Sequence, residues 1–273
     1  KTRLVQALAH ALRAAFADGV WMVALAPVAD PALVPVTVAQ ALGVTLPGRN
    51  GAQDEVVDVL RNRALLLILD NCEHVVEAAS RFVDAVVRGA PRVKVLVTSQ
   101  ESLKVGGEHL YRVPTLAVPA SPDLTTAQTS GAVALFVARV GALQPTFGLT
   151  EQNVADVIEI CRQLDGLALA IELAATRVPL LGVAGVRERL HERFRMLTGG
   201  ARLADRRHQT LHETLDWSHG LLSAEERLIF RRVGVFAGSF NMHAAQEVLA
   251  DDHFDEWAVL NHLGSLVDKS LVV

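Results

Sequence analysis

The chain has 273 residues, of which 51% are hydrophobic and 21% are charged, and its formal net charge is −4 at pH 7. This composition is typical of a globular protein with buried cores, and it excludes an intrinsically disordered chain. The slightly acidic balance gives no overall attraction to nucleic acid, so DNA binding would need a local basic patch or another part of a longer protein.

Hydropathy and cysteine content indicate the compartment. No apolar run approaches the roughly 20 residues that are needed to cross a bilayer, and the start of the chain does not resemble a signal peptide. The two cysteines, Cys72 and Cys161, fit reduced thiols better than a disulfide framework. We therefore expect a cytoplasmic protein that has no membrane partner.

The first 119 residues alternate between helical and strand patterns. Apolar residues recur at helical spacing between Lys1 and Asp18, which predicts a helix at the start of the chain. Five consecutive aliphatic residues at 65–69 predict a strand that is buried on both faces, as in a parallel sheet. In all, the patterns predict strands at about 20–26, 65–69, 93–99 and 109–113, and further helices at about 33–42, 53–61 and 75–87. Strands and helices that alternate in this way predict a three-layer α/β fold.

The pattern changes after residue 119. The segment "PASPDLTTAQTS" is rich in turn-forming residues, so we interpret it as a linker between domains. Beyond it the patterns predict helices at about 131–143, 151–163, 167–177, 185–195, 208–219, 224–233, 242–249 and 256–266, and a closing strand at "KSLVV".

An acidic residue ends the most hydrophobic strand. Because ligands bind beside the carboxyl ends of parallel strands, Asp70 would present its carboxylate at the edge of the sheet where a ligand lies. From that place it could hold a water molecule on a Mg²⁺ ion. The alternative is structural, because Asp70 or Asn71 could instead cap the helix that follows from His74.

The first two residues allow a related interpretation. In a Walker A loop a lysine contacts the β- and γ-phosphates, and the next threonine binds Mg²⁺ as a helix begins. Lys1 and Thr2 open the first predicted helix in that order, although the same pair also suits a solvated first turn. At the end of the third strand, Thr98, Ser99 and Gln100 could donate hydrogen bonds to a γ-phosphate or its attacking water, or they could form a plain turn.

Longer motifs carry a family resemblance across nearly the whole chain. They are "LLLILDNCEH", "VLVTSQESLKVGGEHLYRVPTL", "SGAVALFVARV", "CRQLDGLALAIELAATRV", "RHQTLHETLDWSHGLLSAEERLIFRRVGVFAGSF" and "LVDKSLVV". In this order they resemble the ATPase core of bacterial STAND regulators, of the NB-ARC-like kind that is attached to transcriptional activators. The resemblance implies a P-loop NTPase domain at 1–119, a helical domain at 130–198 and a winged-helix domain at 205–273.

The resemblance also implies roles for particular residues. Lys1 and Thr2 match the end of the Walker A motif, and Asp70 matches the Walker B aspartate, so Thr2 and Asp70 would hold Mg²⁺ beside ATP or ADP. Ser99 and Gln100 match the sensor segment near the γ-phosphate. Gly166 and Ala168 match the family segment "GLPLA", which closes over adenine. His208 matches a possible phosphate contact.

Three departures from the family pattern weaken this site. The resemblance implies that the chain begins inside the Walker A motif, so its sheet lacks the first, central strand and its loop lacks the glycines. Gln100 stands where relatives often have arginine, which removes a positive charge from the γ-phosphate. Ala168 stands where relatives have proline, which loosens the adenine clamp. We expect the chain as given to bind nucleotide poorly.

The residue after Asp70 suggests slow chemistry. Many fast P-loop ATPases place a glutamate there as general base, whereas Asn71 has an amide that cannot accept a proton at neutral pH. Glu73 is the nearest substitute, although a carboxylate in a first helical turn also suits the helix dipole. At most we expect a slow STAND-type ATPase, in which ADP holds a closed state and ATP favours an open one.

Two other functions remain open from the sequence. The chain could be an interaction scaffold that has lost nucleotide binding, which the residues at 71, 100 and 168 favour. It could also bind DNA through the winged helix, but the segment "EWAVLNHLGSLVD" is acidic and apolar, so we expect no direct DNA binding. The expected partners are nucleotide, the DNA-binding and sensor or repeat domains of a parent regulator, and further copies of the chain in a homo-oligomer formed on activation.

Overall fold

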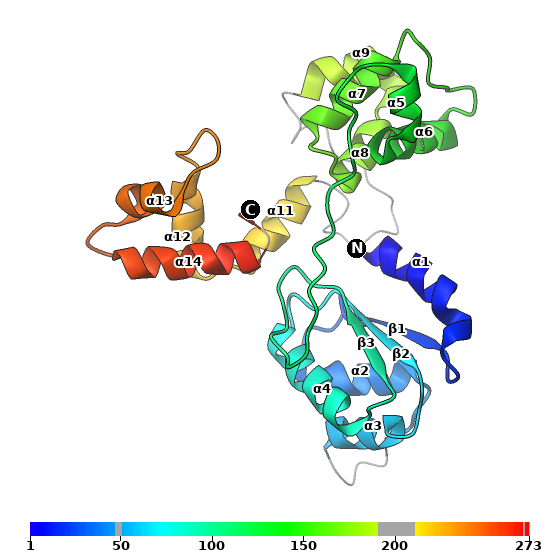
Figure 1. Ribbon diagram of the computed structural model, residues 1–273, viewed down its shortest axis with the longest axis vertical. Helices are drawn as coiled ribbons and strands as arrows, with labels where there is room; N and C mark the ends of the chain where they lie inside the picture. The colour runs from blue at the N-terminus through cyan, green and yellow to red at the C-terminus, as the bar shows by residue number, and fades with distance from the viewer. Residues whose placement is uncertain (47–50, 191–210, 270, 273) are drawn as a thin grey trace. The chain divides into compact units, whose positions relative to one another are not determined.

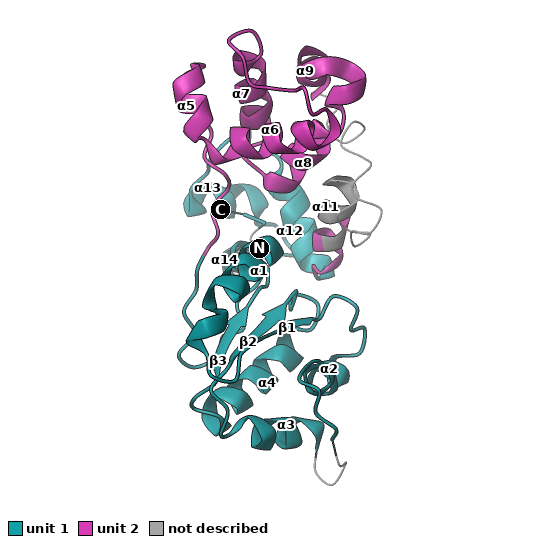
Figure 2. Ribbon diagram, turned by 90° about the vertical axis from the view of Figure 1, so that its right-hand side faces the viewer, with its two compact units in different colours: residues 1–111, 223–273 teal, residues 112–222 magenta. Residues whose placement is uncertain are grey.

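The computed structural model describes residues 1–46, 51–190, 211–269 and 271–272. The chain divides into two compact units (Figure 2). Unit 1 contains residues 1–111 and 223–273, and unit 2 contains residues 112–222. The three domains that the sequence predicts remain a prediction. Within the described ranges no helix is long and apolar enough to cross a membrane.

A parallel three-stranded sheet is the centre of residues 1–111 (Figure 1). The strands are β1 (Val20–Ala24), β2 (Leu66–Asp70) and β3 (Lys94–Val97), in the spatial order β1-β2-β3. Val20 pairs with Leu66, and Leu66 pairs with Lys94. All five residues of β2 are buried, which explains the run of aliphatic residues in the sequence. The α/β class and the first three predicted strands are therefore confirmed.

Helices cover both faces of this sheet. They are α1 (Thr2–Leu12), which continues as a 3₁₀ turn at Arg13–Ala15, α2 (Val34–Ala41), which follows a 3₁₀ turn at Pro31–Leu33, α3 (Ala52–Leu60) and α4 (Val76–Gly89). Side chains of β2 alternate between the two faces. Leu66 and Ile68 pack with Val5 of α1, whereas Leu67 and Leu69 join the larger cluster of α2, α3 and α4.

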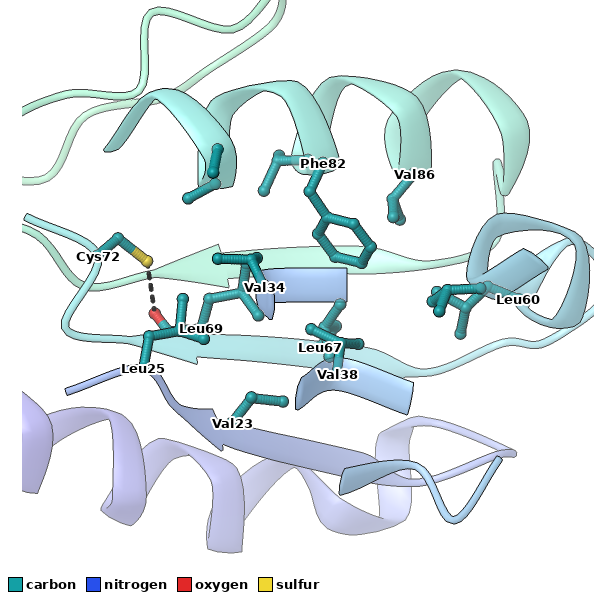
Figure 3. Packing of buried hydrophobic residues seen from close by; sticks show 14 of the residues in the cluster. Val23, Leu25, Val34, Val38, Leu60, Leu67, Leu69, Cys72, Phe82 and Val86 are labelled. Carbon is teal, nitrogen blue, oxygen red and sulfur yellow. Dashed lines mark hydrogen bonds between the residues drawn. The ribbon is translucent and has the colours of Figure 1, made fainter. Parts of the chain in front are cut away.

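Figure 3 shows that larger cluster from close by. Phe82 and Val86 of α4 point toward the sheet, over Leu67, and both are completely buried. The Cys72 thiol lies at the end of this core and donates a hydrogen bond to Leu69 O at 3.7 Å. The carboxyl end of β2 is thus fixed by packing on both of its faces.

The predicted fourth strand at 109–113 is wrong. These residues form no strand, and Leu110 and Tyr111 are 67% and 78% exposed. A strand needs a neighbour for its backbone N–H and C=O groups, and no described strand pairs with this segment. The predicted closing strand falls partly on residues 270 and 273, outside the described part. Leu271, which belongs to the predicted strand, donates its N–H to Leu266 O near the end of α14.

Unit 2 is helical. Its described helices are α5 (Leu124–Thr129), α6 (Gly131–Leu143), α7 (Val154–Gln163), α8 (Ala168–Ala175), α9 (Val178–Arg189) and α11 (Leu211–Gly220). Phe136, Ile158 and Ile171 are completely or almost completely buried in its core. The expected linker contains α5, whose first N–H groups are capped because the Asp123 side chain accepts a hydrogen bond from Thr126 N at 2.8 Å.

The described part of residues 223–273 contributes to unit 1 the helices α12 (Ala224–Val233), α13 (Met242–Leu249) and α14 (Glu256–Asp268). Ile229 of α12 is buried, as are Val259 and Leu263 of α14. The predicted helices at 224–233 and 242–249 have the predicted ends. The winged-helix assignment stays a prediction.

A buried ion pair holds α12 against the end of α14. The Glu226 side chain closes a capping box with Ser223 and accepts hydrogen bonds from Lys269 Nζ at 2.7 and 2.8 Å. It also accepts a hydrogen bond from Ser265 Oγ. Burial by itself raises the pKa of Glu226, but these hydrogen bonds outweigh burial and lower the pKa below its usual value.

Replacing Glu226 should therefore destabilise these helices. In Glu226→Ala the Lys269 ammonium loses its partner while it stays largely buried, so we expect a loss of about 3 kcal/mol in the free energy of unfolding. Urea unfolding followed by far-UV circular dichroism measures this. An exposed carboxylate outside the helices supplies the control, because Asp252→Ala should leave the unfolding midpoint nearly unchanged.

The pH dependence has a defined sign. Because the pKa of Glu226 is lowered in the folded state, its contribution is complete above the usual value of 4.5 and is lost as the pH falls through the folded-state pKa. Wild type and Glu226→Ala should therefore converge in stability on acidification. Equal stability of the two proteins at pH 7 would contradict the assignment.

Candidate functional site

The hydroxyl of Thr2 faces the carboxylate of Asp70. Asp70 is the last residue of β2 and is only 5% exposed, and Thr2 is the first residue of α1. Thr2 Oγ1 lies 3.1 Å from Asp70 Oδ1 and 3.0 Å from Asp70 Oδ2. Two residues that are 68 positions apart in the sequence are thus brought together at the carboxyl edge of the sheet.

A lysine ammonium lies at the same edge. Lys1 Nζ donates a hydrogen bond to Ser99 O at 2.5 Å, just beyond the end of β3. Burial lowers the pKa of Lys1, and the negative charge of Glu73 partly offsets this effect. Gln100 follows Ser99 in the chain and is half-buried. The Lys1 ammonium is therefore held by the Ser99 carbonyl and lies within the electrostatic influence of Glu73.

Thr98 connects Asp70 to the end of β3. Its hydroxyl donates to Asp70 Oδ1 at 2.5 Å and accepts a hydrogen bond from Asn71 N at 2.9 Å. Thr98 is 7% exposed. The sequence pattern predicts this hydroxyl at the same edge of the sheet as Asp70, but it does not predict the hydrogen bond between them. The missed signal was that β2 and β3 are adjacent parallel strands, whose last residues must lie side by side.

The helix-capping alternative for Asp70 and Asn71 is wrong. Helix α4 has Val75 at its N-cap and no side-chain capping bond. Asn71 instead has a left-handed backbone with φ of 70°, a conformation that asparagine tolerates better than most residues. Its side-chain amide lies 3.4 Å from His74 Nδ1, and His74 Nε2 lies 3.0 Å from Val28 O.

Glu73 lies before α4 rather than in its first turn. The helix begins at Val76, so a role against the helix dipole does not explain this carboxylate. Burial lowers the pKa of Lys1, and the charge of Glu73 partly offsets this effect. Burial raises the pKa of the Cys72 thiol well above its usual value, and the charge of Glu73 adds to that effect. Cys72 is thus a protonated core residue and no nucleophile.

Gly166 and Ala168 belong to unit 2, not to the unit that holds the other described candidates. Gly166 has φ of +65° and accepts a hydrogen bond from Leu116 N at 2.9 Å. A Cβ atom at this position would lie 2.1 Å from Leu116 O. Ala168 is the first residue of α8. Gly166 therefore has a structural function in unit 2, whereas His208 lies outside the described residues.

The side chains at the sheet edge suit a magnesium–phosphate ligand in part. A hydroxyl and a carboxylate are the hard oxygen donors that Mg²⁺ prefers, and an ammonium group suits phosphate oxygens. In the described ranges no group of three or more His, Cys, Asp or Glu side chains could hold a metal ion. A Mg²⁺ ion at Thr2 and Asp70 would therefore depend on water and phosphate for its remaining ligands, as is usual for this ion. Such a ligand would also need backbone N–H donors from a glycine-rich loop, which these residues do not supply.

Comparison with known proteins gives relatives over the whole chain. The chain is 40% identical over 274 aligned residues to "Putative HTH-type transcriptional regulator Rv0890c" of Mycobacterium tuberculosis (strain ATCC 25618 / H37Rv) and equally similar to "Putative HTH-type transcriptional regulator Mb0914c" of Mycobacterium bovis. It spans 30% of the length of each. It is also 38% identical to "Uncharacterized protein Rv0894" of Mycobacterium tuberculosis, of which it covers 67%. No protein-family model matches the chain.

The structural function of Gly166 can be tested directly. In Gly166→Ala, the left-handed backbone and the contact with Leu116 O should lower the free energy of unfolding by about 2 kcal/mol or more in the absence of any ligand. Gly141 of α6 is the matched control, because nothing lies within 4 Å of a Cβ there. Gly141→Ala should raise stability by about 0.5–1 kcal/mol. Thermal unfolding measured by circular dichroism compares the two variants, and a fully stable Gly166→Ala protein would refute the structural function.

Proposed function

We propose that this chain, which belongs to the same family as the Mycobacterium tuberculosis protein Rv0894, is the ATP/ADP-binding switch module of a transcriptional regulator. The regulator context rests on relatives that are named HTH-type transcriptional regulators. The nucleotide-binding function rests on the side chains at the edge of the sheet. The single observation that carries it is the hydrogen bonding of Thr2 to both carboxylate oxygens of Asp70.

Each residue at the edge would have a separate task. Lys1 would contact phosphate oxygens, and Thr2 and Asp70 would hold Mg²⁺, with Asp70 acting through a bound water. Ser99 and Gln100 would lie near the terminal phosphate and distinguish ATP from ADP. Bound Mg²⁺ supplies positive charge that offsets the charge of the phosphates.

Hydrolysis would be slow, because the residue after Asp70 cannot serve as a base. Asn71 has a neutral amide and uses its backbone N–H to bind Thr98 Oγ1. Glu73 would be the remaining candidate for a catalytic base, since its charge acts on Lys1. A slow reaction suits a switch, because each nucleotide state must persist long enough to be sensed.

Direct DNA binding by residues 205–273 has little support. Helix α14 is the one that would enter a groove, but its only charged residues are Glu256 and Asp268. Anionic side chains oppose contact with phosphates. DNA binding and effector sensing would therefore belong to other parts of a full-length regulator, because the chain spans only 30% of the length of the HTH-type relatives.

A nucleotide-independent scaffold is the second candidate. One observation favours it: the Lys1 ammonium, which would have to contact phosphate in the switch, already donates a hydrogen bond to Ser99 O without a ligand. In that case the same contact would simply attach α1 to the sheet edge.

Titration of the full-length protein with ADP and ATP separates the two candidates. The switch predicts Mg²⁺-dependent binding that Lys1→Ala weakens about 10- to 100-fold, as expected for a charge-assisted contact to phosphate. Lys94→Ala is the matched control, because Lys94 is exposed at the opposite, amino end of β3. Binding that is absent, or equally weakened by both variants, would favour the scaffold.

A further inference from the structure

Thr98 is a buried hydroxyl whose hydrogen bonds have a fixed direction. A hydroxyl has one proton and two lone pairs. Because Asn71 N–H can only donate, it occupies a lone pair of Thr98 Oγ1 at 2.9 Å. The proton of Thr98 is then available for the Asp70 carboxylate, which can only accept, and Oδ1 lies at 2.5 Å. The chain of donors therefore runs from Asn71 through Thr98 to Asp70.

The first donor in this chain is itself held in place. Asn71 has a left-handed backbone, and its side-chain amide lies near His74 Nδ1. A carbonyl oxygen can only accept, so His74 Nε2 donates its proton to Val28 O, and the other ring nitrogen, Nδ1, lies 3.4 Å from the Asn71 side-chain amide. Asn71 thus contacts Thr98 through its backbone N–H and His74 through its side-chain amide.

The result is that the Asp70 carboxylate is bonded from two directions. Thr98, the residue after β3, donates to Oδ1, and Thr2 of α1 lies within hydrogen-bonding distance of both oxygens. A carboxylate on one rotatable side chain would otherwise sample several rotamers, and fixing it before a ligand arrives lowers the entropic cost of binding.

We propose that Thr98 is a positioning residue of this site, which directs the Asp70 carboxylate toward Thr2 and so prepares both groups for Mg²⁺. The role rests on the proposed nucleotide function. Asn71 supports it by holding the Thr98 hydroxyl, and this explains why asparagine stands there: a glutamate would be strained in the left-handed conformation. The position serves the geometry of Asp70 and does not supply a base.

Variants at position 98 separate positioning from packing. Thr98→Val keeps the shape of the side chain and removes the hydroxyl, whereas Thr98→Ser keeps the hydroxyl and removes the methyl group. Thr37→Val is the matched control, because its hydroxyl makes a single hydrogen bond within unit 1, to Leu33 O, far from Asp70 in the sequence. Asn71→Gly provides a second test, because glycine accepts the left-handed backbone and keeps the N–H group.

The first measurement uses the full-length protein without nucleotide. Hydrogen exchange of the Asn71 amide, followed by NMR, should be at least about 10-fold faster in Thr98→Val than in wild type, because the amide loses its acceptor. It should stay close to the wild-type rate in Thr98→Ser and in Thr37→Val. An unchanged exchange rate in Thr98→Val would overturn the proposal, because the Asn71 N–H would then not depend on the Thr98 hydroxyl.

The second measurement compares ADP affinity with Mg²⁺ and with excess EDTA. In Thr98→Val the increase in ADP affinity that Mg²⁺ causes should be about 10- to 100-fold smaller than in wild type. The affinity for ADP in EDTA should be unchanged. Thr98→Ser and Asn71→Gly should retain most of the gain. If wild-type protein binds ADP and the affinity of Thr98→Val rises with Mg²⁺ by the same factor as that of wild type, the role of Thr98 alone would be overturned. Wild-type protein that binds neither nucleotide would overturn the proposed function, and the positioning role with it.

Discussion

The structure depends on how β2 ends. Five buried residues fix this strand between α1 on one face and α2, α3 and α4 on the other, so its last residue has little freedom to move. That residue is an aspartate, and a polar side chain that is only 5% exposed must be hydrogen-bonded. Thr2 and Thr98 supply the bonds from two different elements of the chain. The start of α1 and the end of β3 are therefore positioned by one charged group, and any ligand at this edge would meet groups that are already ordered.

Sequence patterns predicted a local element well where the spacing of apolar residues alone defines it. The aliphatic run at 65–69 predicted a strand with two covered faces because only a parallel sheet buries both. The segment at 109–113 has the composition of a strand, but composition does not show whether a neighbour exists to pair with it. Helix α5 was missed because its six residues are too few to show a period, although Asp123 is a good N-cap.

The candidate site was predictable only in part, for a related reason. Asp70 and Thr2 were identified by type and position, whereas the hydrogen bond between Thr98 and Asp70 joins residues 28 apart and depends on the register of two strands. Gly166 shows the opposite case. The family motif gives it a role at adenine, but the structure gives it a local reason, the close approach of Leu116 O. A glycine in a motif is thus explained first by its own backbone, and a function at a ligand needs separate support.

The central claim is that Thr2 and Asp70 act as one unit toward Mg²⁺, and a double-mutant cycle tests it most directly. Thr2→Val, Asp70→Asn and the double variant would each be titrated with ADP in the presence of Mg²⁺, using full-length protein. If the two groups share one ion, the second substitution should cost little after the first, which gives a coupling energy of about 1 kcal/mol or more. Effects that add to within about 0.5 kcal/mol would mean that the two side chains act independently, and the account would be contradicted.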